Sequence, residues 1–276
     1  MSSPALNLLV PEARTLPPDA GEATLARLYA HAPGVVRATM IATVDGGAWG
    51  PDHVSGSIND DADWRVFRVL RALADVVVVG AGTARAERYT QLGRPRGLGH
   101  LRADSLELAV VTRSGDVPQT LLEGDRPPLV ITGAHGAQAA LAAVPPERVI
   151  VAPVPPGGDG ADGGGASAGT PPHDVDLGAG LAALTARGLS RVLCEGGPHL
   201  LADLLAAGLV DELCLTTAAL LVGPGPDRIV AGGPPGAGPP SPARLAHLLH
   251  APDAGTMLAR WLLRAPRARA GRPQAR

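Results

Sequence analysis

The sequence predicts an α/β fold. Apolar segments of strand length alternate with helical patterns along the 276 residues of the chain, which is typical of a sheet with helices packed against it. Hydrophobic residues make up 45% of the chain, so a full core can be buried. At residues 75–83 and 191–200, a buried strand opens into a helix through small residues. These observations favour one domain built on one sheet.

The elements follow in order along the chain. The helix at 61–73 has apolar residues at mostly three- and four-residue spacing, and Asn59 or Asp60 can cap its start. The last helix opens with Pro198 and closes near Gly208. The last two strands are expected to pair antiparallel, because only a long Pro/Gly-rich connection separates them. The expected strands are 35–43, 75–79, 106–112, 128–132, 148–152, 191–194, 212–217 and 256–263, and the expected helices are 61–73, 137–143, 177–187 and 198–207.

Composition excludes several classes of protein. The formal net charge of −2 argues against a broad nucleic-acid footprint. All basic side chains are Arg, which excludes a lysine nucleophile or a Walker-type phosphate lysine. The two cysteines, Cys194 and Cys214, sit in apolar runs and are expected in the core, and the sequence carries no zinc-binding pattern. No segment has the pattern of a signal peptide or a membrane span, so a cytoplasmic protein is expected.

The domain boundaries are predicted from composition. We expect an N-terminal extension at 1–33, a single domain at 34–264 and a basic C-terminal tail at 265–276. The segments 153–172 and 232–242 are too rich in Gly and Pro to bury much apolar surface, so both are expected to be surface loops, the first of them flexible.

The two strand-to-helix junctions suit a phosphate group. Backbone amides and the positive end of the helix dipole point outward there, and glycine lets a pyrophosphate approach without a Cβ in the way. A tight turn that only packs a helix on a sheet is the alternative. The first junction departs from the dinucleotide fingerprint G-x-G-x-x-G, because Arg85 replaces its third glycine. Two such junctions in one chain favour dinucleotide binding.

Six motifs together resemble the riboflavin-biosynthesis pyrimidine reductase family over roughly residues 34–263. The resemblance implies a dihydrofolate reductase-like three-layer α/β fold, with a mostly parallel central sheet, an antiparallel C-terminal strand and helices on both faces. It also implies NADPH as cofactor and a homodimer. The motifs are Thr43-Val44-Asp45-Gly46, Ser55-Gly56, Arg68-x-x-Arg71, Val79-Gly80-Ala81-Gly82-Thr83, Glu195-Gly196-Gly197-Pro198-His199-Leu200 and Leu209-Val210-Asp211-Glu212-Leu213.

The resemblance implies a set of cofactor-binding residues. Thr112, Arg113 and Ser114 follow a buried strand, and a guanidinium flanked by hydroxyls suits the 2′-phosphate that separates NADPH from NADH. An ordinary polar turn is the alternative for these three residues. The other expected cofactor-binding residues are Ser57, Gly80, Gly82, Thr83, Gly196, Gly197, Pro198, His199 and Leu200.

The resemblance also implies a substrate site at Ser55, Arg71, Glu87 and Glu195. Arg71 suits the substrate phosphate, although a solvated helix face would look the same. Glu195 ends a hydrophobic strand, where a carboxylate is costly to bury without a partner or ligand. Glu195 and Asp45 are the catalytic candidates, and the alternative for Asp45 is a simple turn before glycine.

The chain departs from the family pattern at two places. Gly47 stands where many members have Lys or Arg after Asp-Gly, and Glu87-Arg88-Tyr89 replaces a stretch like Asp-Asp-Pro, where Glu87 can keep the acidic role. The basic residue that assists the substrate phosphate is left open among Arg88, Arg94 and Arg96.

The function implied by the resemblance is the NADPH-dependent reduction of 5-amino-6-(5-phosphoribosylamino)uracil to the ribitylamino product. The motifs of the zinc deaminase that often precedes this reductase are absent from the sequence, and no metal site is expected. Two alternatives stay open. One is a reductase of dihydrofolate or another heterocycle, and the other is a non-catalytic NADP-binding protein.

Overall fold

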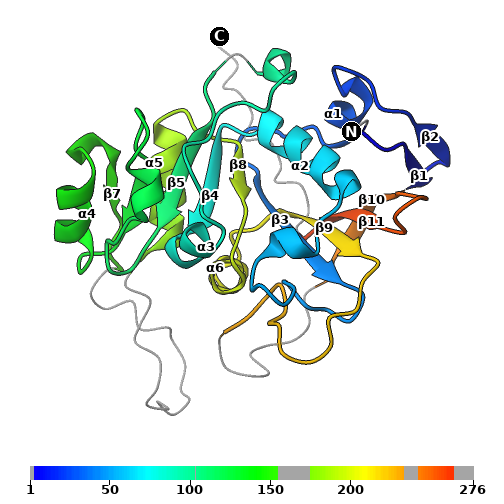
Figure 1. Cartoon of the computed structure of the whole chain (residues 1–276). Coiled ribbons are helices and arrows are strands. Elements are labelled where there is room, and N and C mark those ends of the chain that lie inside the picture. The colour runs from blue at the N-terminus through cyan, green and yellow to red at the C-terminus, as the bar shows by residue number, and fades with distance from the viewer. Residues whose placement is uncertain (1–2, 103, 155–174, 233–241, 264–276) are drawn as a thin grey trace, which may run out of the picture.

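The computed structural model describes residues 3–102, 104–154, 175–232 and 242–263 and shows one 11-stranded sheet (Figure 1). The strand order is β2-β1-β10-β11-β9-β3-β8-β4-β5-β6-β7. The strands are β1 Leu6–Val10, β2 Arg14–Leu16, β3 Val36–Thr43, β4 Val76–Gly80, β5 Glu107–Val111, β6 Leu129–Thr132, β7 Val149–Val151, β8 Val192–Cys194, β9 Glu212–Ala218, β10 Arg244–His250 and β11 Met257–Leu262. The α-helices are α1 Ala23–Leu28, α2 Asp61–Leu73, α3 Ala81–Ala86, α4 Ala137–Ala143, α5 Leu177–Ala186 and α6 Pro198–Ala206.

The sheet is parallel over most of its width. Every neighbouring pair from β9 through β3, β8, β4, β5 and β6 to β7 is parallel. Beyond β9, the pairs β9–β11, β11–β10, β10–β1 and β1–β2 are antiparallel. The predicted α/β class, the mostly parallel sheet and the antiparallel C-terminal strand are therefore confirmed.

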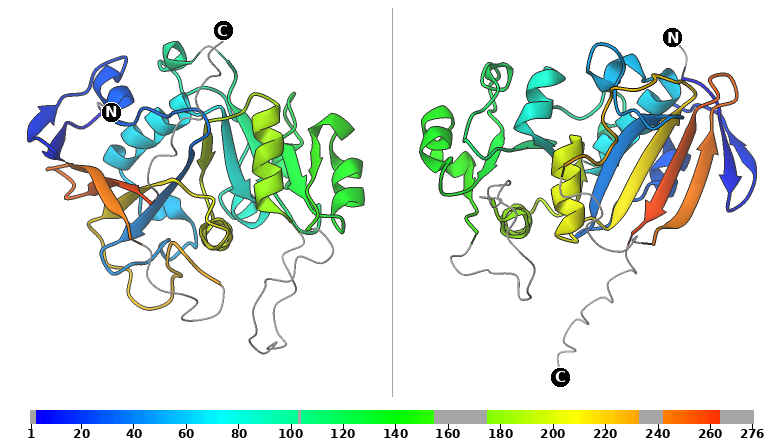
Figure 2. Two further views of the ribbon diagram at one scale, coloured as in Figure 1. Left: turned by 180° about the vertical axis from the view of Figure 1, so that it is seen from behind. Right: turned by 90° about the horizontal axis from the view of Figure 1, so that it is seen from below.

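Strand β4 shows how the sequence places helices on both faces. Val77 and Val79 point into the cluster that contains α1, α2 and α3, whereas Val76 and Val78 point into the cluster that contains α5 and α6. A strand buried on both faces has no polar side to present, which explains its continuous run of valine. Figure 1 and the left-hand view of Figure 2 show the two faces from opposite directions, with α2 in front in Figure 1 and α5 in front in the left-hand view of Figure 2.

The eight strands expected from the sequence are all present, each within one residue at either end. Helices α2 and α4 have the expected bounds, and α5 and α6 each end one residue early. The Asp60 side chain caps α2 by accepting hydrogen bonds from the amides of Ala62 and Asp63, both at 2.9 Å. Cys194 and Cys214 are buried free thiols, as expected for core residues.

The sequence predicts no strand in the connection between the last two expected strands, and this prediction is wrong. Strand β10 lies within that connection and pairs with β11, so β9 and β11 are not consecutive. Its sequence, RLAHLLH, mixes Arg and His with leucine and has no strict alternation, because a bulge between Leu245 and His247 shifts the register. The periodicity that identifies a half-buried strand is lost there.

The N-terminal residues add elements that the sequence did not indicate. Strand β1 pairs with β10, and Leu6 is fully buried in the cluster that also holds α2. The division of the chain into an extension at 1–33 and a domain at 34–264 stays a prediction. Apart from their end residues, the expected loops at 153–172 and 232–242 lie outside the described residues, as does the tail at 265–276. None of the described helices is both long enough and apolar enough to cross a bilayer.

A buried ionic cluster joins the N-terminal part to the antiparallel end of the sheet. The fully buried Arg37 donates from Nε to Glu212 Oε2 at 2.7 Å and from Nη1 to the Tyr29 carbonyl at 2.7 Å. Arg260 donates to the other oxygen of Glu212 at 2.5 Å. The His247 ring packs edge-on against Tyr29, with a centroid separation of 4.5 Å. Burial, and then the two nearby guanidinium groups, lower the pKa of His247 to about 4.

We predict that His247 makes the protein sensitive to acid. Its pKa lies below the value of about 6.5 in the unfolded chain, so the unfolded state binds the proton first as pH falls. The stability contributed by the neutral ring is complete above about pH 6.5 and is lost towards pH 4, on the order of 3 kcal/mol. His247→Phe keeps the contact with Tyr29 and cannot titrate, so its urea midpoint should fall less between pH 7 and pH 4.5.

His250→Phe on the same strand serves as the control, since that residue is partly exposed. An equal fall in the urea midpoint for wild type and His247→Phe would contradict this assignment.

Candidate active site

Two adjoining cavities open at the carboxyl ends of the parallel strands. The smaller has a volume of about 570 Å³ and the larger about 610 Å³. Five residues line both cavities: Gly82, Thr83, Gly197, Pro198 and His199. Ligands of open α/β sheets bind at this edge, and the shared wall places the contents of the two cavities next to each other.

The shared wall forms because α3 and α6 begin close together. The Gly80 amide donates to the Gly196 carbonyl at 2.8 Å, which links the ends of β4 and β8. A Cβ on Gly197 would lie 2.2 Å from Thr83 Oγ1, so any larger residue would require the Thr83 side chain to shift. A Cβ on Gly82, by contrast, would meet no atom within 4 Å. The backbone at Gly82 is therefore open to a ligand.

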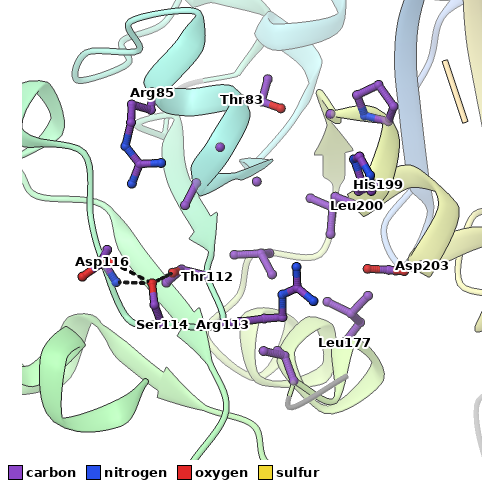
Figure 3. Close-up of a pocket in the computed structure, with 17 residues that line it drawn as sticks. Thr83, Arg85, Thr112, Arg113, Ser114, Asp116, Leu177, His199, Leu200 and Asp203 are labelled. Atoms are coloured by element: carbon purple, nitrogen blue, oxygen red, sulfur yellow. Dashed lines mark hydrogen bonds between the residues drawn. The ribbon is translucent and has the colours of Figure 1, made fainter. Parts of the chain in front are cut away.

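One end of the smaller cavity is polar (Figure 3). Thr112 and Ser114 lie with their hydroxyl oxygens 3.4 Å apart, and Ser114 donates to Asp116 at 2.9 Å. Arg113, in the loop after β5, and Arg85, on α3, also line this cavity. The structure thus brings Thr112, Arg113 and Ser114 to the same cavity as the two glycine junctions.

A buried ion pair forms one wall of the larger cavity. Arg71 donates from Nε to Glu195 Oε1 at 2.7 Å and from Nη2 to Oε2 at 2.6 Å, while the Tyr89 hydroxyl donates to Oε2 at 2.6 Å. The Glu195 side chain is 2% exposed and that of Arg71 is 17% exposed. The alternative of Arg71 as a solvated surface residue is therefore wrong, because its guanidinium is paired with a carboxylate and packed on Phe67.

This network fixes the protonation of its members. Burial disfavours the charged guanidinium, but attraction to Glu195 outweighs it and raises the pKa of Arg71 above its ordinary value. Burial and the Glu195 charge raise the pKa of Tyr89 well above its ordinary value. The Tyr89 hydroxyl therefore keeps its proton and acts as a donor to the carboxylate.

Ser55 and Glu87 also line the larger cavity, so all four expected substrate-binding residues meet there. The Ser55 amide donates to Glu87 Oε1 at 2.7 Å. Of the three arginines left open for the phosphate, only Arg88 lines this cavity. Arg94 instead donates to main-chain carbonyls, including that of Ala74 at 2.5 Å.

Three expected site residues line neither cavity: Asp45, Ser57 and Gly196. Asp45 accepts hydrogen bonds from the Thr43 hydroxyl at 2.5 Å and the Gly223 amide at 2.7 Å, and these bonds lower its pKa. Ser57 donates to Asp52 at 2.5 Å. Asp45 thus holds the loop after β9, and Asp227 of that loop lines the larger cavity.

Sequence reasoning missed several residues of the larger cavity. The sequence predicts no role for Tyr89, which belongs to the stretch where the chain departs from the family pattern. Its position two residues after Glu87 is the one feature of the sequence that places it near the expected substrate site. Asp63, Phe67 and Trp49 also line the cavity. Phe67 belongs to the apolar spacing that predicts α2, whereas Asp63 lies in the first turn of that helix, where an acidic residue is ordinary. The described residues contain no cluster of side chains suited to a metal ion.

Comparisons with known proteins agree with this geometry. A family model described as the RibD C-terminal domain matches residues 35–249. A pyrimidine reductase-like protein from Corynebacterium diphtheriae is 27% identical, over 88% of this chain and 99% of that chain, with a TM-score of 0.68. No curated protein matches the chain significantly.

Two further solved structures share the fold at lower identity. RibD from Acinetobacter baumannii is 18% identical over 84% of this chain, with a TM-score of 0.60, and the match spans 59% of that longer chain. The riboflavin biosynthesis reductase Rib7 from Saccharomyces cerevisiae is 15% identical over 87% of this chain and 98% of that chain, with a TM-score of 0.55.

We predict that removing either Arg71 or Glu195 alone destabilises the protein more than removing both together would suggest. Glu195→Leu leaves a mostly buried guanidinium without its counter-charge and should cost about 3–5 kcal/mol of unfolding free energy. Arg71→Leu should cost a similar amount for the opposite reason. The double variant buries no unpaired charge, so urea denaturation should show a loss well below the sum of the two single losses. Additive losses would contradict the pairing.

Proposed function

The chain belongs to the RibD C-terminal domain family, and we propose that it is an NADPH-dependent oxidoreductase of riboflavin biosynthesis. Its proposed reaction reduces 5-amino-6-(5-phosphoribosylamino)uracil to the ribitylamino product. The observation that carries the proposal is the wall shared by two cavities, because hydride transfer requires cofactor and substrate to touch.

The smaller cavity fits a dinucleotide. Its glycine junctions expose main-chain amides at the starts of α3 and α6, and the space beside Gly82 is open to a pyrophosphate. Gly80, Gly82, Thr83 and the segment 197–200 are the proposed contacts. We assign no cofactor contact to Ser57, since its hydroxyl is bonded to Asp52 outside both cavities.

The polar end of the smaller cavity suits the adenosine 2′-phosphate. Arg113 offers a charged fork, and Thr112 lines the same cavity. Arg85 adds a second guanidinium to the same cavity. Asp116 and Asp203 line this cavity too, so the support for NADPH over NADH rests on the two guanidinium groups as hydrogen-bond donors and not on a net positive charge.

The larger cavity suits the phosphorylated pyrimidine. Glu195, held by Arg71 and Tyr89, presents a fixed carboxylate to amino or hydroxyl donors of the substrate. Glu195 engages Nε and Nη2 of Arg71 and balances its charge, so we assign the substrate phosphate to Arg88, which lines the same cavity as Ser55 and Glu87.

In this proposal the bound nicotinamide supplies hydride to ribose C1 of the ring-opened imine. The chain binds the two reactants on either side of Gly82, Thr83 and His199 and excludes water from the contact. Glu195 touches the substrate and orients it. Asp45 keeps the loop after β9 in place, which favours a positioning role over proton transfer. A homodimer is expected, as the family resemblance implies.

The proposal is tested by NADPH oxidation, followed by absorbance, with the phosphoribosylaminopyrimidine and dihydrofolate offered in parallel. We expect turnover of the pyrimidine with NADPH and much slower turnover with NADH. Turnover of dihydrofolate alone would contradict the proposed substrate but would agree with the proposed cofactor. Saturable NADPH binding with no turnover of either compound would favour a non-catalytic protein.

We further predict that Arg113 sets the cofactor preference. Arg113→Ala should raise the KM for NADPH by about 10–100-fold, the value of a charge-assisted hydrogen bond, and leave the KM for NADH nearly unchanged. Arg187→Ala is a matched control, because that exposed arginine lines neither cavity. An equal rise in KM for both cofactors would contradict a contact with the 2′-phosphate.

A further inference from the structure

One carboxyl group of the larger cavity has no role in the function proposed above. Asp63 lies in the first turn of α2 and is 9% exposed, yet its side chain lines that cavity. A carboxylate at such a site loses most of its hydration, which is costly unless donors replace the water. The hydrogen bonds of Asp63 therefore need to be accounted for.

Only one of its two oxygens has a partner. Asp63 Oδ1 accepts a hydrogen bond from the Thr216 hydroxyl on β9. Among the described residues, none donates to Oδ2 and none forms an ion pair with Asp63. Burial raises the pKa of Asp63 to about 6, the Thr216 bond opposes this rise, and the nearby Asp60 adds to it. Asp63, which lines this cavity and a small space beside Thr216, therefore has one carboxyl oxygen left that can accept a bond.

The cavity that Asp63 lines also presents aromatic side chains. Trp64 stacks on Phe67, with ring centroids 5.6 Å apart, and both line the cavity with Trp49 and Met40. Aromatic and sulfur-containing side chains favour a planar ring as their neighbour. The combination of a planar apolar surface and one open acceptor suits a planar nitrogen heterocycle with an N–H donor at its edge.

We propose that Asp63 Oδ2 accepts a hydrogen bond from a ring N–H or an exocyclic amino group of the heterocycle bound in the larger cavity. Asp63 thereby selects a nitrogen base over a ring of equal shape without donors. This inference rests on the proposed function, because it names the residue that recognises the pyrimidine of that substrate. It assigns the ring to Asp63 and leaves the ribose and phosphate to Glu195 and Arg88.

The test uses two probes of nearly equal shape. 2,4-Diaminopyrimidine carries two amino groups that donate N–H bonds. In 2,4-dimethylpyrimidine, methyl groups replace both amino groups. Their dissociation constants are measured by calorimetry on the full chain saturated with NADPH. We expect wild type to bind the diamino probe at least about tenfold more tightly than the dimethyl probe, as for one charge-assisted hydrogen bond.

Three variants separate recognition by Asp63 from a structural role. Asp63→Leu should abolish the preference between the probes, and Asp63→Asn, which keeps a neutral acceptor oxygen, should reduce it to about threefold. Thr216→Val removes the other hydrogen bond of Asp63 but keeps the carboxylate, so the preference should largely persist. Asp61→Asn is the matched control on the same turn, since Asp61 is exposed and lines neither cavity. Unchanged NADPH binding shows that each variant is folded.

A preference that survives in Asp63→Leu, or that is absent in wild type, would overturn the inference. Loss of preference in Thr216→Val as complete as in Asp63→Leu would also overturn it, because Asp63 would then act only through Thr216. Probe binding needs no turnover, so the outcome is independent of the reductase assay. If wild type does reduce the phosphoribosylaminopyrimidine, Asp63→Asn should raise the KM of that substrate by about threefold and leave the KM of NADPH unchanged.

Discussion

The close approach of two helix starts at the end of the parallel sheet determines the rest of the site. Gly80 and Gly196 are joined by a main-chain hydrogen bond, and Gly197 packs against Thr83 at a distance that no larger residue permits while Thr83 keeps its position. Because this contact stands between the two cavities, it sets both their separation and their common opening. A side chain at Gly197 would collide with the Thr83 hydroxyl, so Thr83 would have to move within the wall that both ligands are proposed to share.

The second constraint is electrostatic. Glu195 follows directly after β8 and is almost fully buried, so its charge must be balanced locally. Arg71 comes from α2 and Tyr89 from the segment after α3, and both converge on that one carboxylate. The network therefore ties three separate elements to the edge of the sheet. It gives a charged wall beside the aromatic residues of α2, since Arg71 packs on Phe67, and the cavity thus offers both polar groups and an apolar surface.

The fold was predictable where periodicity is strong. The valines of β4 and the apolar spacing of α2 indicate their elements directly, and the order of strands gives the α/β class. Strand β10 was not predictable, because a bulge breaks its alternation and its burial depends on β1, which is far away in sequence. At the site, the family motifs placed Glu195 and Arg71 in one expected substrate site. They could not show that the two side chains form an ion pair. Asp63 was hidden because an acidic residue is ordinary in the first turn of a helix, where it favours the helix dipole, and only the cavity reveals its second environment.

The central claim is that the two cavities hold cofactor and substrate in direct contact across the wall formed by Gly82, Thr83 and His199. The most direct measurement is isotope transfer from NADPH carrying deuterium at the transferable position of C4 of the nicotinamide, followed by mass spectrometry and NMR of the ribitylamino product. The account predicts one deuterium at C1 of the ribityl chain, with no loss to solvent. A product formed without deuterium at that carbon would contradict direct transfer between the cavities.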